Sequence, residues 1–186
     1  MPPTGGSSTA EQPRFYYDLA SPEAYLVAER ALHALGEVPE WIPVRDDSLA
    51  FRCAAEVDAY KEDVERRARA LGLMALRWPE PFPADTDWAI LAATYAKQIG
   101  RGVAFSLAAF RQAFAAGRDL SERDNVLIAA AACEMHPAAV IKGAELASTR
   151  RALDEANERA SVDGVDAVPA IWTPDGVLEG ERAVPA

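Results

Sequence analysis

Cysteine is scarce in this chain. There are two, Cys53 and Cys133, and they do not form a Cys-x-x-Cys pair. Dithiol–disulfide exchange needs a reactive thiolate beside a second thiol, so the sequence argues against a dithiol oxidoreductase. In a reducing compartment we expect both cysteines to be free thiols. The two histidines, His33 and His136, match no metal-ligand spacing, and we therefore expect no metal site.

Positive charge and long apolar runs are also lacking. The chain has 19 Lys and Arg against 29 Asp and Glu, a formal net charge of −10 at pH 7. That sign is wrong for binding a phosphate backbone or an anionic membrane surface. No stretch approaches the roughly 20 apolar residues of a membrane span. We therefore expect neither nucleic acid nor a membrane as a partner.

The start of the chain has no apolar run either. Residues 1–13 are rich in Pro, Gly, Ser and Thr, and they lack the basic start and the apolar core of a secretory signal. We therefore expect a disordered tail over residues 1–13 and a cytoplasmic protein.

Apolar material for a core is abundant. Hydrophobic residues make up 50% of the 186, which suits one domain, or one domain with a large insertion. Aromatic residues over 14–19 predict a buried strand, an apolar stripe over 22–35 predicts a helix, and residues 41–44 predict a second strand. Near the other end of the chain, residues 165–172 and 177–179 predict two strands joined by a turn of the Asp-Gly type.

Between these strands the pattern is helical. Apolar residues recur at helical spacing through residues 51–160, and glycines mark the ends of several segments. We therefore predict an α/β protein with a thioredoxin-like core formed by residues 14–50 and 161–186. The core is interrupted by a large inserted all-helical domain over residues 51–160.

Ser21 lies where the first predicted strand turns into the first predicted helix. A serine at the cap and Pro22 at the first helical position are typical of a helix start. The N-terminus of a helix presents unpaired N–H groups and a partial positive charge, which stabilise an anion such as a thiolate. Ser21 therefore has two interpretations: a helix cap alone, or a cap that also holds a thiolate.

Pro169 lies in the strand predicted over residues 165–172. Proline cannot donate a sheet hydrogen bond, so a position at a strand start explains it without any function. The alternative is a cis peptide bond before Pro169, which would turn the backbone N–H and C=O of Val168 outward. An extended ligand backbone could pair with those groups as an added strand.

Four segments carry a resemblance to a known family. Residues 15–26, FYYDLASPEAYL, resemble the opening of 2-hydroxychromene-2-carboxylate isomerases and kappa-class glutathione transferases, in the DsbA-like branch of the thioredoxin superfamily. Residues 77–83, RWPEPFP, are similar to a segment typical of the isomerases. Residues 165–171, VDAVPAI, resemble the cis-proline strand of the family, and residues 180–182, GER, its Gly-x-Asp-Arg loop.

The resemblance implies a site for glutathione or another low-molecular-weight thiol, without a metal. Ser21 would hydrogen-bond the sulfur, and Val168 would bind the cysteinyl backbone. Pro169 would fix the turn, while Glu181 and Arg182 would lie near the γ-glutamyl end. In the isomerases the thiolate adds reversibly to a conjugated substrate so that a double bond can rotate. The resemblance thus implies an isomerase or a glutathione transferase that acts on a small conjugated or aromatic electrophile.

Three further residues are weaker candidates for the site, and several alternatives to this hypothesis are open. Asp18, Tyr25 and Trp78 are weaker candidates for the substrate pocket, and each can instead be structural. The loop over residues 44–51 lacks the Asn- and Pro-rich segment with a Lys that helps to hold glutathione in the family. A different thiol is therefore an alternative cofactor. A non-catalytic DsbA-like protein that binds a peptide or partner is an alternative function. The resemblance also leaves a homodimer open.

Overall fold

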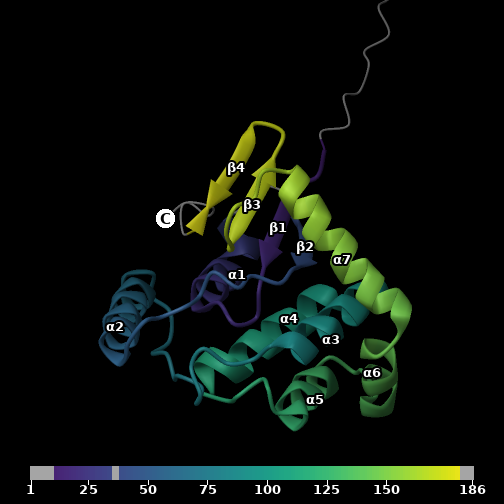
Figure 1. The fold of residues 1–186 in the computed structure, drawn as a ribbon, viewed down its shortest axis with the longest axis horizontal. Helices are drawn as coiled ribbons and strands as arrows, with labels where there is room; N and C mark the ends of the chain where they lie inside the picture. The colour runs from purple at the N-terminus through teal and green to yellow at the C-terminus, as the bar shows by residue number, and fades with distance from the viewer. Residues whose placement is uncertain (1–10, 35–37, 181–186) are drawn as a thin grey trace, which may run out of the picture.

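The strands form one four-stranded sheet with the order β2-β1-β3-β4 (Figure 1). The computed structural model describes residues 11–34 and 38–180. The strands are β1 (Arg14–Tyr17), β2 (Glu40–Pro43), β3 (Ala170–Thr173) and β4 (Gly176–Glu179). β1 runs parallel to β2 and antiparallel to β3, which in turn forms a hairpin with β4. The predicted α/β architecture is confirmed.

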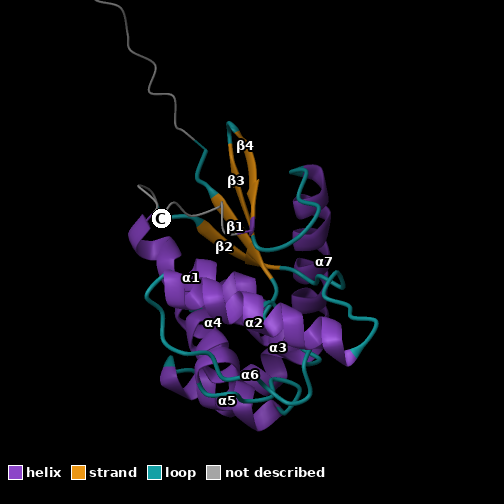
Figure 2. Ribbon diagram, turned by 90° about the vertical axis from the view of Figure 1, so that its left-hand side faces the viewer, coloured by secondary structure: helices purple, strands orange, loops and turns teal. Residues whose placement is uncertain are grey.

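Helix α1 (Pro22–Ala34) connects β1 to β2, and the remaining helices lie between β2 and β3 in the chain. They are α2 (Ala54–Ala70), α3 (Asp87–Gln98), α4 (Gly102–Phe110) with a π-helical turn (Arg111–Ala115), α5 (Arg123–Ala132), α6 (Pro137–Ala144) and α7 (Ala147–Val162). Figures 1 and 2 show α3 to α6 gathered below the sheet, while α7 runs back along it. This is the stretch predicted to be helical, and its exact domain boundaries stay a prediction.

Strand β1 is buried on both faces. Its residues Phe15, Tyr16 and Tyr17 are all 0% exposed. Successive strand residues point to opposite faces, so Phe15 and Tyr17 pack into the main helical core while Tyr16 packs with Ile42 and with Ala160 of α7. The aromatic run therefore forms the central strand because helices cover the sheet on each side.

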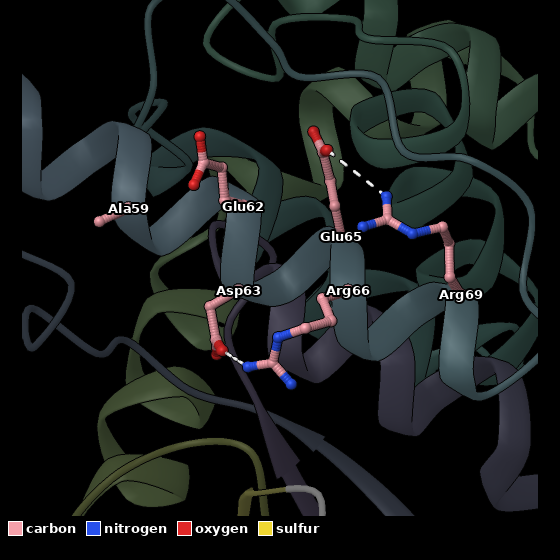
Figure 3. A pocket seen from close by; sticks show the side chains of 6 residues that line it. All are labelled: Ala59, Glu62, Asp63, Glu65, Arg66 and Arg69. Atoms are coloured by element: carbon pink, nitrogen blue, oxygen red, sulfur yellow. Dashed lines mark hydrogen bonds and ion pairs between the residues drawn. The ribbon is translucent and has the colours of Figure 1, made fainter.

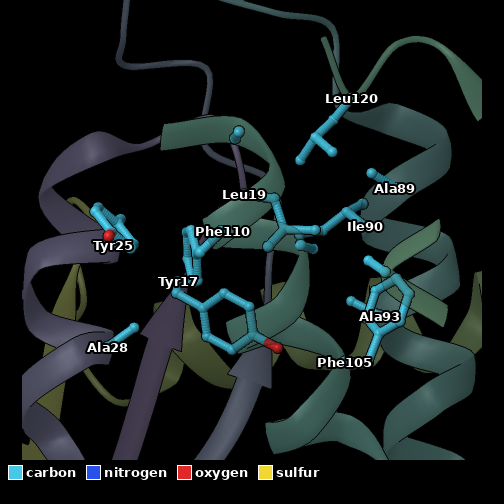
Figure 4. Packing of buried hydrophobic residues seen from close by; sticks show 14 of the residues in the cluster. Tyr17, Leu19, Tyr25, Ala28, Ala89, Ile90, Ala93, Phe105, Phe110 and Leu120 are labelled. Carbon is cyan, nitrogen blue, oxygen red and sulfur yellow. The ribbon is translucent and has the colours of Figure 1, made fainter. Parts of the chain in front are cut away.

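The main core fixes the end of β1 that leads to Ser21. Figure 4 shows Tyr17 pointing from the sheet into a cluster that includes Leu19, Phe105 and Phe110. The hydroxyls of Tyr17 and Ser106 share a buried hydrogen bond of 2.5 Å. Burial raises the pKa of the Tyr17 phenol. The pairing matters because a buried hydroxyl without a partner would be costly, so it ties β1 to α4.

The last strand pair begins later than the sequence pattern predicts. We expected a strand from Val165, but β3 begins at Ala170. The Val165 N–H donates to the carbonyl of Ala160 (3.0 Å) and so closes the end of α7 instead of joining a strand. Pro169 has no N–H to give to a sheet. Both effects keep residues 165–169 out of the ladder.

Some expectations fall on parts of the chain that lie outside the described residues. Of the predicted tail, residues 1–10 lie outside them, while the carbonyl of Pro13 accepts a hydrogen bond from the N–H of Glu40 (2.7 Å). Glu181 and Arg182, predicted near a γ-glutamyl group, also lie outside them. Within residues 11–34 and 38–180, the helices are all too short or too polar to cross a membrane.

Candidate functional site

Three chain segments meet at one edge of the sheet. Tyr17 is opposite Pro43 in the parallel pair β1–β2, and Tyr16 is opposite Ala170 in the antiparallel pair β1–β3. The residues that follow β1 and β2 therefore lie at the same edge as the residues that precede β3. This register brings together Asp18, Ser21, Val168 and Pro169, which sequence reasoning had singled out from distant parts of the chain.

Ser21 caps helix α1. The side chain is 8% exposed, and its hydroxyl oxygen accepts a hydrogen bond from the N–H of Ala24 (3.1 Å). A hydroxyl also carries one proton to donate, and within the described ranges that proton meets no acceptor. Ser21 can therefore cap the helix and still donate to a ligand atom in front of it. A ligand sulfur there would also feel the partial positive charge of the helix end.

The corner between β1 and helix α1 (the Ser21 corner) has no cysteine at either position of a redox pair. Ser21 and Ala24 stand where the two cysteines of a redox pair would stand, and Ala24 is fully buried. The free cysteines lie elsewhere: Cys53 is exposed in front of α2, and Cys133 is buried at the end of α5. Burial raises the pKa of the Cys133 thiol. Positions 21 and 24 therefore supply no sulfur, and a nucleophilic sulfur bound at Ser21 would come from a ligand.

Asp18 joins the segments of the edge to one another. Its carboxylate accepts hydrogen bonds from the N–H of Ala20 (2.8 Å), the hydroxyl of Thr86 (3.0 Å) and the N–H of Asp46 (2.9 Å). Asp18 is 5% exposed, and burial raises the pKa of its carboxyl group although these donors favour the charged form. The side chain links β1 to the loop after β2 and to the start of α3.

Asp46 is a residue of the candidate site that the sequence analysis did not single out. Its carboxylate accepts a hydrogen bond from the N–H of Val168 (3.2 Å), the residue before the cis bond to Pro169. The same carboxylate accepts from the N–H (2.9 Å) and the hydroxyl (2.8 Å) of Ser48. An Asp followed two residues later by Ser is a signal for such a turn. No sequence signal indicates the contact with Val168.

Two hollows border the loop after β2. One has a volume of about 350 Å³ and is lined by Asp18, Ala20, Arg45, Asp46, Asp47, Leu49 and residues 83–87. The other, about 160 Å³, is lined by residues 44–46, Asn157, Ala160, Ser161 and residues 165–168. Arg45 and Asp46 line both, so this loop forms part of each wall. The larger hollow is acidic, because Arg45 is its one basic side chain and pairs with Asp87 (3.0 Å).

Tyr25 and Trp78, the weaker candidates, meet through Phe114. Tyr25 is 3% exposed and lies inside the core, with its ring centroid 5.8 Å from that of Phe114. Trp78 is half-buried, packs edge-on against Phe114 (6.3 Å) and Phe82 (4.9 Å), and donates its indole N–H to Glu65 (2.7 Å). Tyr25 is thus a core residue in position, while Trp78 belongs to a half-buried aromatic group formed by Phe51, Tyr60, Trp78 and Phe82.

The hollow in Figure 3 is of another kind. It measures about 440 Å³ and is lined by residues of α2 alone: Ala59, Glu62, Asp63, Glu65, Arg66 and Arg69. Arg66 pairs with Asp63, and Arg69 pairs with Glu65 along the same helix. These are ordinary ion pairs of an exposed helix surface, and the hollow contains no residue of the sheet edge. Across the part of the chain that the structure describes, no group of His, Cys, Asp or Glu is arranged to hold a metal.

The mixed four-stranded sheet, with helices over its faces, and the matching family model place this protein among the thioredoxin-fold proteins. More particularly, the chain belongs to the DSBA-like thioredoxin domain family, whose model matches residues 14–185. The predicted thioredoxin-like fold and the predicted DsbA-like branch are therefore confirmed.

Solved structures with this fold include enzymes of different chemistry. A 2-hydroxychromene-2-carboxylate isomerase is similar with a TM-score of 0.79 and 16% identity, over 90% of this chain and 88% of that one. A probable DsbA oxidoreductase from Streptomyces coelicolor has a TM-score of 0.73 and 19% identity, over 91% and 83%. The cytosolic disulfide reductase DsbM from Pseudomonas aeruginosa has a TM-score of 0.67 and 15% identity, over 90% and 89%, and has also been solved with GSH. At these identities the likeness shows the fold alone. No curated protein matches the sequence.

Proposed function

We propose that this protein is a thiol-dependent enzyme that isomerises or conjugates a small conjugated or aromatic electrophile, with glutathione or another low-molecular-weight thiol as cofactor. The observation that carries the proposal is the Ser21 corner. It combines a helix N-terminus with a hydroxyl whose proton meets no acceptor among residues 11–34 and 38–180, and it has no sulfur at positions 21 and 24. A corner of this kind fits a bound thiol better than it fits dithiol exchange.

The chain's own residues have separate tasks in this proposal. A bound thiol supplies the nucleophile that adds reversibly to a conjugated carbon. Ser21 donates a hydrogen bond to the sulfur, and the N-terminus of α1 lowers the pKa of the thiol, so that the thiolate is populated near neutral pH. Val168 and Pro169 form the edge for the cysteinyl backbone. Glu181 and Arg182 would serve the γ-glutamyl end.

The electrophile is proposed to bind beside the 350 Å³ hollow. The half-buried aromatic group includes Trp78 and Phe82, and the next residue, Pro83, lines that hollow together with Asp18 and Ala20. The adjacency of Phe82 and Pro83 in the chain supports a substrate site that extends from this hollow towards the aromatic group. Aromatic side chains offer a large apolar surface to a planar substrate, which supports an aromatic or conjugated compound.

A non-catalytic DsbA-like protein is the second candidate. In that case the Val168 edge would bind an extended segment of a partner, and the missing cysteines at positions 21 and 24 would leave it without chemistry. The two candidates differ in whether a small thiol binds at the Ser21 corner. In both cases we place the protein in the cytoplasm, where the exposed free thiol of Cys53 is stable. A homodimer is compatible with either candidate.

Thermal unfolding with and without millimolar glutathione tests the proposal. At one hundred times its dissociation constant, a ligand stabilises the folded state by about 2.7 kcal/mol. We expect a rise in Tm for the wild-type protein that shrinks in Ser21→Ala. That variant also loses its cap, at a cost of about 1 kcal/mol, so the ligand-induced shift is compared within each protein.

The matched control is Ser121→Ala. Ser121 is exposed in the turn before α5, and its hydroxyl donates to the carboxylate of Asp119. We expect its glutathione shift to equal that of the wild type. An equal shift in wild type and Ser21→Ala would remove Ser21 from the site. The absence of any shift would leave the partner-binding candidate ahead.

A further inference from the structure

The backbone donor that a thiol ligand needs at the Val168 edge is already used within the chain. The N–H of Val168 donates to the carboxylate of Asp46 at 3.2 Å. In strand addition, an N–H at this edge pairs with a carbonyl of the incoming backbone. The cysteinyl carbonyl of a ligand and the carboxylate of Asp46 therefore compete for one donor.

Asp46 is a strong competitor because its position is well defined. Its own backbone N–H donates to Asp18, and its carboxylate accepts two hydrogen bonds from Ser48. A carboxylate is also a stronger acceptor than an amide carbonyl, since bonds to a charged acceptor are shorter and roughly twice as strong. A ligand carbonyl has to displace a charged acceptor that the loop itself holds in place.

The surrounding charge acts in the same direction. The hollow beside Asp46 is also lined by Asp47, Asp85 and Asp87, and its basic residue, Arg45, is paired with Asp87. Glutathione carries two carboxylates at neutral pH, and like charges at close range oppose its binding. A carboxylate at position 46 therefore disfavours a glutathione backbone by competition and by charge.

We propose that Asp46 is a specificity-determining residue of the thiol site. It occupies the Val168 N–H in the free protein and lowers the affinity for thiols that present a backbone carbonyl and carboxylates, glutathione among them. The inference rests on the proposed function. It predicts that removing the Asp46 carboxylate opens the edge and strengthens glutathione binding.

The test is a calorimetric titration of glutathione into wild type, Asp46→Ala, Asp46→Asn and Asp47→Asn. We expect Kd to fall about tenfold in Asp46→Ala, the scale of one hydrogen bond to a charged group. Asp46→Asn keeps an uncharged acceptor of the same size and is expected to fall between the two. Asp47 is an exposed neighbour that lines the same hollow, and Asp47→Asn removes the same charge without touching Val168. It is expected to change Kd by less than about threefold.

Amide hydrogen exchange at Val168 supplies a readout that does not depend on glutathione. We expect this amide to exchange faster in Asp46→Ala than in wild type, and to be protected again when glutathione binds. Asp46→Asn repeats the comparison in a variant of nearly unchanged side-chain size, should the alanine variant fold poorly.

The outcomes separate the inference from the proposed function. Equal exchange of the Val168 amide in wild type and both Asp46 variants would overturn the role of Asp46, whatever glutathione does. Equal gains in affinity for Asp46→Asn and Asp47→Asn would also overturn it, because charge alone would then explain them. Faster exchange in Asp46→Ala without any binding of glutathione would leave the Asp46 contact standing and would exclude glutathione as the cofactor in the proposed function.

Discussion

Replacing Asp18 by alanine removes the side chain that joins three segments of the sheet edge. The carboxylate accepts hydrogen bonds from the backbone of Ala20 and Asp46 and from the hydroxyl of Thr86. Because Asp18 is 5% exposed, water does not readily replace these bonds after the substitution. The variant therefore loses these bonds and leaves the buried hydroxyl of Thr86 and two partly buried N–H groups unpaired.

The magnitude follows from the number and kind of these bonds. A hydrogen bond to a charged group contributes about 1.5–3 kcal/mol net, and an unpaired buried donor costs about 1–3 kcal/mol. The bonds share one carboxylate and do not add fully. Burial of the charged form, which raises the pKa of Asp18, offsets part of their sum. We expect Asp18→Ala to lower the free energy of unfolding by about 3 kcal/mol.

Urea unfolding at pH 7 measures this loss. With an m-value of about 2 kcal/mol/M, the midpoint falls by about 1.5 M at unchanged m. Asp47→Ala is the matched control, because Asp47 lines the same hollow but is exposed and makes no hydrogen bond within residues 11–34 and 38–180. We expect the control to stay within about 0.5 kcal/mol of wild type.

The dependence on pH gives a second check. The pKa of Asp18 is higher in the folded than in the unfolded protein, where it is about 3.9. The folded state therefore holds the proton more tightly. The resulting stabilisation is complete below the unfolded pKa and is lost as pH rises through the folded pKa. Relative to Asp18→Asn, whose amide does not titrate, wild type should lose stability as pH rises above the unfolded pKa of about 3.9.

Two results would refute this reasoning. A loss below about 1 kcal/mol in Asp18→Ala would mean that the three bonds contribute little to stability. A wild-type advantage over Asp18→Asn that grows with pH would mean that hydrogen bonding, not burial, dominates the pKa of this carboxyl group.

Further predictions concern the core and the thiols. Tyr17→Phe leaves the hydroxyl of Ser106 without its buried partner and should lower the free energy of unfolding by about 1 kcal/mol. A double-mutant cycle with Ser106→Ala should give a coupling energy above about 0.5 kcal/mol. A coupling energy of zero would contradict the contact. In the native protein, the exposed Cys53 should react with a thiol reagent such as DTNB well before Cys133 does. Cys133 is buried, and its raised pKa keeps the thiol protonated. Equal reaction rates for the two cysteines would contradict the structure.

Much of the corner around Ser21 was readable from the sequence because it depends on near neighbours. The cap joins Ser21 to Ala24, three residues away, and Pro22 begins the helix. The aromatic run of β1 indicated a buried strand, and its residues Phe15 to Tyr17 are buried in the structure. Residues 165–171, VDAVPAI, indicated a thioredoxin-like fold through their resemblance to the cis-proline strand of the family.

Only the tertiary structure decided which residues form hydrogen bonds with one another at this edge of the sheet. Asp18 reaches Asp46 across 28 residues and Thr86 across 68, and Asp46 reaches Val168 across 122. Such contacts depend on how the loop after β2 lies against the sheet edge, and no periodicity or spacing encodes that position. The sequence by itself determined the fold, the helix cap and the absence of a redox pair. Packing determined which carboxylate meets Val168, because a partner for a buried donor is set by proximity in space and not along the chain.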